Sequence, residues 1–207
     1  MVRSSPPTRA VLGTTVALLT SCTTTEMAQS WRDSTYTPAP VQHVLVVAIT
    51  PRESYRVAFE DAVAKAFVER GFPTVTAVSL FPEGRPTRDQ VAAYVKSQGV
   101  DLVVTQRVAK QLEITHAPGA PYEPVNANND WYGPWDASAP MAAGPDEYSE
   151  NVTMAAETSV YAVKTQPERA IWRGSSTTFD FRSVRGAAAS LAASLANNLV
   201  KTGILRK

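Results

Sequence analysis

The sequence has very little cysteine and almost no charge imbalance. One cysteine among 207 residues excludes an intramolecular disulfide and a cysteine-rich metal site. Twenty Lys and Arg residues against nineteen Asp and Glu residues give a formal net charge of +1, which excludes a basic nucleic-acid-binding protein and an acidic tail protein. The 44% of hydrophobic and 19% of charged residues are typical of a folded globular protein, and the length predicts one domain with additional segments.

The common motifs of nucleophilic, phosphate-binding and metal chemistry are also absent. The sequence contains no G-x-S-x-G, G-x-x-x-x-G-K, G-x-G-x-x-G or H-E-x-x-H pattern. Its two histidines, His43 and His116, are too few for a zinc site, which needs three or four protein ligands. We interpret both histidines as structural or surface residues, and we expect no cofactor, no metal and no catalytic activity.

A signal peptide is predicted over residues 1–21. The basic residues Arg3 and Arg9 precede a mostly apolar run over residues 10–19, about half as long as a membrane-spanning helix. Small residues then lead to Cys22, the single cysteine. This layout predicts secretion and leaves no segment that would span a membrane.

The residues Leu19, Thr20, Ser21 and Cys22 resemble the lipobox of bacterial lipoproteins, in which a peptidase cleaves directly before the cysteine. The resemblance implies that Cys22 carries thioether-linked diacylglycerol and an amide-linked acyl chain of the palmitate type. Three acyl chains, at about 0.8 kcal/mol per buried methylene, would hold the protein on a membrane. Because Thr23 replaces the inner-membrane retention signal Asp, the resemblance favours the periplasmic leaflet of the outer membrane. The alternative is an unmodified cysteine after a chance apolar run.

Residues 22–40 are predicted to be the acylated cysteine and a flexible tether. The segment is rich in Thr, Ser, Pro and Ala and has no periodicity. Trp31 is the exception, and two interpretations are open: its ring folds back onto the domain, or it lies among the lipid headgroups.

The remaining residues, 41–207, are predicted to form a single α/β domain. A β-branched run over residues 41–49 predicts a buried central strand, and the apolar stripe of residues 53–70 predicts a helix ended by Gly71. We expect Arg56 and Glu60 to form a pair outside that stripe, four residues apart. Residues 73–81 predict a second strand.

The second half of the domain is predicted from capping and alternation. A capping box formed by Thr87 and Gln90 opens a helix that ends at Gly99, and residues 101–114 predict a third strand. Residues 151–164 and 169–181 predict a hairpin, and Ser183 caps a last helix. The order β-α-β-α-β-loop-β-β-α predicts a mixed sheet with helices mainly on one face.

An insertion at residues 117–147 is rich in Pro, Gly, Asn and aromatic residues, and a loop of this length is uncommon unless it is functional or disordered. It is the candidate working surface, and its candidate binding residues are the aromatic residues Tyr122, Trp131, Tyr132 and Trp135. These rings either cover one face of the sheet or bind a protein or glycan partner. The loop also carries acids, which we interpret as solvated rather than as an acid/base pair: Glu123, Asp130, Asp136, Asp146 and Glu147.

Several short motifs resemble those of uncharacterised bacterial lipoproteins. They are the hydrophobic strand at 44–49, the helix end at Arg70 and Gly71, the strand opening at Asp101, the Trp131-Tyr-Gly segment, and the I-W-R-G run at residues 171–174. The element order is similar to the anticodon-binding-like fold of the TolB N-terminal domain and of the curli secretion lipoprotein CsgG. This resemblance implies a fold and no function. Because no pair of long amphipathic strands is present, we do not carry over the secretion channel of CsgG.

Three functional hypotheses follow from the sequence. The first is a non-catalytic, membrane-anchored envelope lipoprotein that binds another envelope component, protein or glycan, through the 117–147 loop. The second is a hydrolase that acts on cell wall or glycan through loop carboxylates. The third is a subunit of a homo-oligomeric export or assembly complex. No nucleic-acid partner is expected, and the sequence leaves the oligomeric state open.

Overall fold

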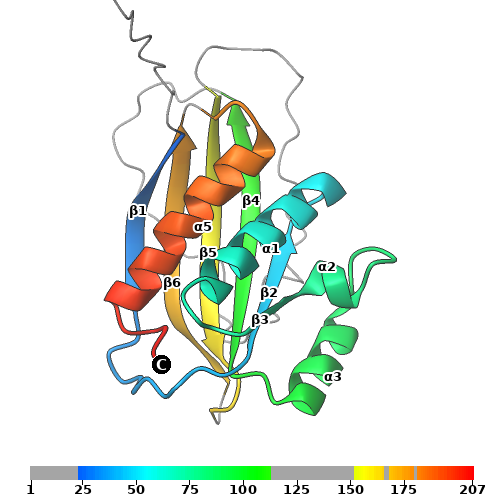
Figure 1. Cartoon of the computed structure of the whole chain (residues 1–207), viewed down its shortest axis with the longest axis vertical. Coiled ribbons are helices and arrows are strands. Elements are labelled where there is room, and N and C mark those ends of the chain that lie inside the picture. Colours follow the sequence, from blue (N-terminus) through cyan, green and yellow to red (C-terminus); the bar gives the residue numbers. More distant parts are fainter. Residues whose placement is uncertain (1–22, 113–151, 166–167, 180) are drawn as a thin grey trace, which may run out of the picture.

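The structure is a computed structural model that describes residues 23–112, 152–165, 168–179 and 181–207. In these residues one six-stranded sheet has the strand order β1-β6-β5-β4-β2-β3, with helices on both of its faces (Figure 1). The elements, in chain order, are β1 (Thr24–Arg32), β2 (Val44–Ile49), α1 (Glu53–Val68), β3 (Thr74–Thr76), α2 (Ala77–Leu80), α3 (Arg88–Gln98), β4 (Leu102–Leu112), β5 (Val152–Ala162), β6 (Arg169–Phe179) and α5 (Val184–Lys201).

The sheet is mixed, as the element order predicts. Strand β2 runs parallel to both β3 and β4, since helical crossovers join these strands. Strands β4, β5, β6 and β1 are antiparallel to their neighbours. The α/β fold class predicted from the sequence is therefore confirmed.

The two long helices, α1 and α5, pack on the same face of the sheet. Val63 and Phe67 of α1 and Leu195 and Leu199 of α5 share one buried cluster with strand residues such as Val104. On the opposite face, Val91 and Val95 of α3 pack against Leu45 and Val103. The prediction of helices mainly on one face is correct for α1 and α5, whereas α3 and, through Ala77, the short helix α2 belong to the cluster on the opposite face.

The predicted helix ends agree with the structure. In α3, Thr87 Oγ1 accepts a hydrogen bond from Gln90 N at 3.3 Å, and Gln90 Oε1 accepts one from Thr87 N at 2.8 Å, which completes the capping box. Gly99 ends the helix with φ 61°, a left-handed conformation that favours glycine. Ser183 Oγ accepts a hydrogen bond from Gly186 N at 3.1 Å and caps α5.

The expected tether is a strand over much of its length, which corrects the sequence prediction. Residues Thr24–Arg32 form β1, which pairs with β6 along the edge of the sheet. Hydroxyl groups also link β1 to β6 and α5. Thr25 Oγ1 lies 2.7 Å from Thr178 Oγ1 and donates a hydrogen bond to Ser190 Oγ at 2.9 Å. Threonine suits strands as well as linkers, so composition alone could not separate the two. Trp31 is 51% exposed on this strand.

The predicted strand over residues 73–81 is also corrected. Only Thr74–Thr76 pair with β2, and the chain then turns into the short helix α2. Thr76 causes this switch, because its Oγ1 accepts a hydrogen bond from Ser79 N at 3.2 Å. A side chain that caps the backbone in this way competes with the strand ladder.

The I-W-R-G motif in β6 is a packing motif. Trp172 is fully buried, and a Cβ atom at Gly174 would lie 2.8 Å from Cζ2 of its indole. Gly174 is therefore required because the indole occupies the space that a side chain would fill. The motif contributes Ile171 and Trp172 to the buried cluster that also contains Leu195 and Leu199 of α5.

The topology gives the domain two distinct ends. Thr24 lies opposite Phe179, and Leu112 lies opposite Val152, so the start of β1, the end of β4 and the start of β5 share one end of the sheet. The helices α1 and α5 both finish at the opposite end (Figure 1). We call these the Thr24 end and the distal end.

Replacing Leu195 with Ala should lower the free energy of unfolding by about 2 to 5 kcal/mol, because its fully buried side chain would leave a cavity between α5 and the sheet. Chemical denaturation measures this change. Ala193→Ser on the exposed side of the same helix is the control and should shift stability by less than about 0.5 kcal/mol. Equal stability of the two variants would mean that α5 does not pack as described.

Candidate functional site

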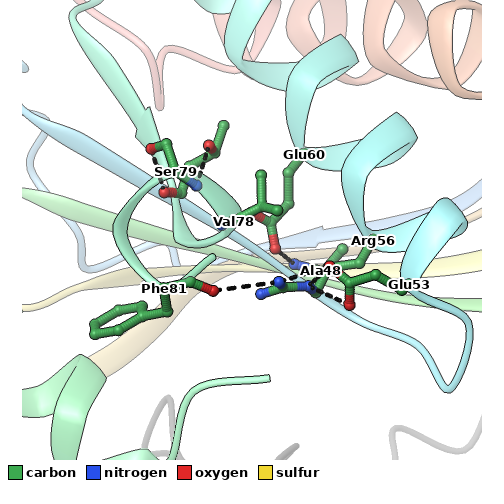
Figure 2. Close-up of polar contacts among 8 residues, drawn as sticks. Ala48, Glu53, Arg56, Glu60, Val78, Ser79 and Phe81 are labelled. Atoms are coloured by element: carbon green, nitrogen blue, oxygen red, sulfur yellow. Dashed lines mark hydrogen bonds and ion pairs between the residues drawn. The ribbon is translucent and has the colours of Figure 1, made fainter. Parts of the chain in front are cut away.

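A buried acid and a buried base lie one turn apart on α1. Glu60 is 0% exposed and Arg56 is 2% exposed, and both point toward β2 and α2 (Figure 2). The sequence predicted that they would form a pair outside the apolar stripe, and this prediction is wrong. Each has its own partners, and burial of two charges makes this cluster the chemically most unusual place in the described residues.

The Glu60 carboxylate joins two backbone segments. Its Oε1 accepts a hydrogen bond from Ala48 N at 2.9 Å, and its Oε2 accepts one from Val78 N at 2.6 Å. Ala48 lies beyond Val46, the last residue of β2 that pairs with β3. The carboxylate therefore satisfies the edge of β2 at the position where β3 would otherwise continue. We call Glu60 with these two amides the Glu60 bridge.

Arg56 links the first turn of α1 to the residue that follows α2. Its Nε and Nη2 donate to the Glu53 carboxylate at 2.7 to 3.0 Å, and Nη2 also donates to the carbonyl of Phe81 at 3.3 Å. Its Nη1 is buried and has no hydrogen-bond partner in the described part of the chain. The Arg56 guanidinium thus links α1 to Phe81, the residue that follows α2, whereas Glu60 links α1 to Val78 within α2.

The electrostatics of Glu60 are dominated by its burial. Desolvation raises the pKa of this carboxyl from 4.5 to about 7, although the amides of Ala48 and Val78 and the nearby Arg56 act in the opposite direction. The group therefore changes charge near neutral pH. Because both oxygens accept backbone hydrogen bonds, the protonated form would lose one of these acceptors.

This geometry suits a structural bridge better than a catalytic group. Both Glu60 oxygens are occupied by the protein's own amides, and the side chain has no exposed surface. Among the residues that the structure describes, no group of three or more His, Cys, Asp or Glu side chains could hold a metal ion. Within the same ranges, no helix is long and apolar enough to cross a bilayer.

The candidate residues predicted from the sequence fall mostly elsewhere. Cys22, the four aromatic residues at 122, 131, 132 and 135, the loop acids and His116 all lie outside the described residues. His43 is described and is structural, with Nδ1 3.3 Å from the carbonyl of Gln98 and its ring edge-on to Tyr94. Leu112, the last described residue before the insertion, pairs with Val152, the first described residue after it, at the Thr24 end of the sheet.

The Glu60 bridge was missed because the sequence pattern points the other way. An Arg and a Glu four residues apart beside an apolar stripe usually form a solvated pair. The decisive fact is the early end of β3 at Thr76, which leaves an amide of β2 without a strand partner. Thr76 and Ser79 are three residues apart and form a capping pair inside an apparent strand. This spacing is the one sequence signal that could have revealed the Glu60 bridge.

Comparison with solved structures finds similar arrangements of elements at low sequence identity. Two PelC dodecamers from Paraburkholderia phytofirmans align with TM-scores of 0.45 and 0.44 and identities of 14% and 11%, covering 83% of this chain and 98% and 94% of theirs. Lipoprotein GNA1162 from Neisseria meningitidis aligns with a TM-score of 0.41 and 15% identity over 77% of this chain and 99% of its own. No protein-family model and no curated protein matches the chain.

Replacing Glu60 with Gln should flatten the dependence of stability on pH. Because the folded protein binds the Glu60 proton more tightly than the unfolded chain does, the free energy of unfolding should fall as pH rises from about 4.5 to about 7. The fall for this group is about 3 to 4 kcal/mol at most, at about 1.4 kcal/mol per pKa unit. Denaturant titrations across this pH range measure the slope.

The control for this experiment is Glu83→Gln, which removes an exposed carboxylate close to the same loop. It should keep the slope of the wild-type protein. A Glu60→Gln protein with the same slope as the wild type would show that Glu60 does not take up a proton in the folded state.

Proposed function

We propose that this chain is a non-catalytic envelope lipoprotein, anchored through acylated Cys22, whose domain binds another envelope component close to the membrane. The position of Cys22 carries the proposal. The cysteine ends a signal-peptide layout with lipobox spacing, and only Thr23 separates it from the first strand of the sheet.

The described residues support a short connection between lipid and domain. The carbonyl of Thr23 accepts a hydrogen bond from Ser190 Oγ of α5 at 3.2 Å, so the residue that follows Cys22 is already part of the domain. One residue spans at most about 3.6 Å. An acyl group on Cys22 would therefore hold the Thr24 end of the sheet at the bilayer surface.

Charge at the same end agrees with this orientation. Arg182 and Arg185 are exposed around the first turn of α5, beside Thr23. Basic residues at an anionic membrane surface contribute about 1 kcal/mol each. They would assist the acyl chains, and no membrane-spanning segment is needed.

The partner surface that we propose is the aromatic insertion. The described strands on either side of it, β4 and β5, end and begin at the Thr24 end, and Trp131 and Trp135 belong to the sequence between them. Aromatic side chains bind protein and glycan partners well because they bury a large area at low entropic cost. We propose the outer membrane as the location, with the domain on its periplasmic face.

The hydrolase alternative requires two carboxylates that converge on one substrate. Glu60, which is fully buried, has both oxygens occupied by backbone amides and does not supply one of them. The loop carboxylates to which the hydrolase hypothesis assigns this role lie outside the described residues. The alternative of a homo-oligomeric export or assembly subunit is compatible with the same anchor, and the mass of the purified protein in detergent distinguishes the two.

Replacing Cys22 with Ser should abolish membrane anchoring. Without the thiol no diacylglycerol can be attached, and the protein should be released or remain an uncleaved precursor. Membrane fractionation with metabolic labelling by radioactive palmitate measures both outcomes. A mature Cys22→Ser protein that still sediments with the outer membrane would contradict the lipoprotein proposal.

Replacing Trp131 and Trp135 together with Ala separates the two interpretations of the insertion. As exposed binding residues they should leave the melting temperature nearly unchanged while crosslinked partners disappear. If they cover the sheet, each truncation should cost roughly 3 to 5 kcal/mol. A thermal melt and a pull-down on the same double variant are needed, and a large loss of stability contradicts the binding role.

A further inference from the structure

A groove of about 620 Å³ lies at the distal end, between the last turns of α1 and α5 and the C-terminal segment. Its lining includes the basic residues Arg70, Lys201 and Arg206. Phe72 and Leu205 also line it, although both are almost completely buried. We call it the distal groove.

The rim of the distal groove is strongly cationic. Its lining contains Arg70, Lys201, Arg206 and Lys207 against a single acid, Glu69, which already faces Lys65 at 3.9 Å. In the described ranges none of the four cations forms an ion pair with an acidic side chain. A protein with nearly balanced charge thus collects four basic side chains around one cavity.

Helix dipoles do not account for this excess. The C-termini of α1 and α5 each contribute about half a negative charge. Together with Glu69 and the α-carboxylate of Lys207 they supply about three negative charges, which leaves an excess of about one positive charge on the rim. That excess is available to an anionic ligand.

The groove also offers apolar contact, and one of its cations is held in place. Val200, in the wall formed by α5, is 45% exposed. Arg70 Nη1 donates to the carbonyl of Ala66 at 2.7 Å, and its Nη2 donates to Asn197 Oδ1 at 2.6 Å. A guanidinium fixed between two helices loses little entropy when it binds a carboxylate.

We propose that the distal groove is the docking site for an acidic segment of a partner protein that places an apolar side chain between its carboxylates. The exposed Val200 favours a peptide, since an anionic polysaccharide or a lipid headgroup would leave this apolar side chain without a complement. The inference rests on the groove alone and is independent of the anchor at Cys22. If the anchor is as proposed, the groove faces away from the membrane.

The test measures binding of a defined peptide to the full-length protein in a neutral detergent. The probe is a fluorescein-labelled peptide that repeats Glu-Leu-Asp-Ala, followed by fluorescence anisotropy. The double variant Lys201→Glu with Arg206→Glu should weaken binding by about tenfold or more, because two attractive contacts become repulsive. Both side chains are exposed, so the melting temperature should stay unchanged.

Two controls separate docking from general attraction to positive charge. The double variant Arg182→Glu with Arg185→Glu makes the same charge change at the opposite end of α5 and should alter affinity less than about twofold. Val200→Ser removes apolar contact at constant charge and should weaken binding by about threefold or more.

Three results would overturn the proposal. One is an equal loss of affinity in the two charge-reversal variants, and another is unchanged affinity in Val200→Ser. The third is that polygalacturonate or dihexanoylphosphatidylglycerol displaces the peptide more effectively than unlabelled peptide does, which would assign the groove to a glycan or a lipid. Retained binding in a Cys22→Ser protein would show that docking and anchoring are independent.

Discussion

Buried backbone amides must find hydrogen-bond partners, and the organisation of this domain around β2 depends on that constraint. Strand β3 ends at Thr76, so the amide of Ala48 on β2 has no strand opposite it. The carboxylate of Glu60 occupies this position and binds the amide of Val78 as well. The crossover from α1 through α2 is thereby tied to the edge of the parallel part of the sheet by one titratable side chain.

Sequence reasoning predicted those elements whose signals are local. The capping box at Thr87 and Gln90 and the left-handed Gly99 define α3 without reference to the rest of the fold, because each is a contact between near neighbours. Sequence reasoning failed where an element depends on a partner that is distant in the sequence. Strand β1 exists through its pairing with β6, roughly 150 residues away, and Thr25 reaches Ser190 on α5.

The candidate site shows the same division. Cys22 could be predicted as a lipidation site because the pattern that suggests it is contained in the residues directly before it. The burial of Glu60 and Arg56 was not predictable, since it follows from where β3 ends and from how α2 folds back. The distal groove was equally hidden, because Arg70 and Arg206 are separated by most of the domain in sequence and meet only through the packing of α1 and α5.

The close approach of Trp172 to Gly174 has an optical consequence. The indole of Trp172 is sealed between β6 and α5, and its Nε1 has no hydrogen-bond partner in the described part of the chain, so its fluorescence should be shifted to the blue. Trp31, on the neighbouring strand β1, is half exposed and should emit at longer wavelength. In a protein in which Trp131 and Trp135 are replaced, these two residues on adjacent strands would report separately on the packed interior and on the edge of the sheet.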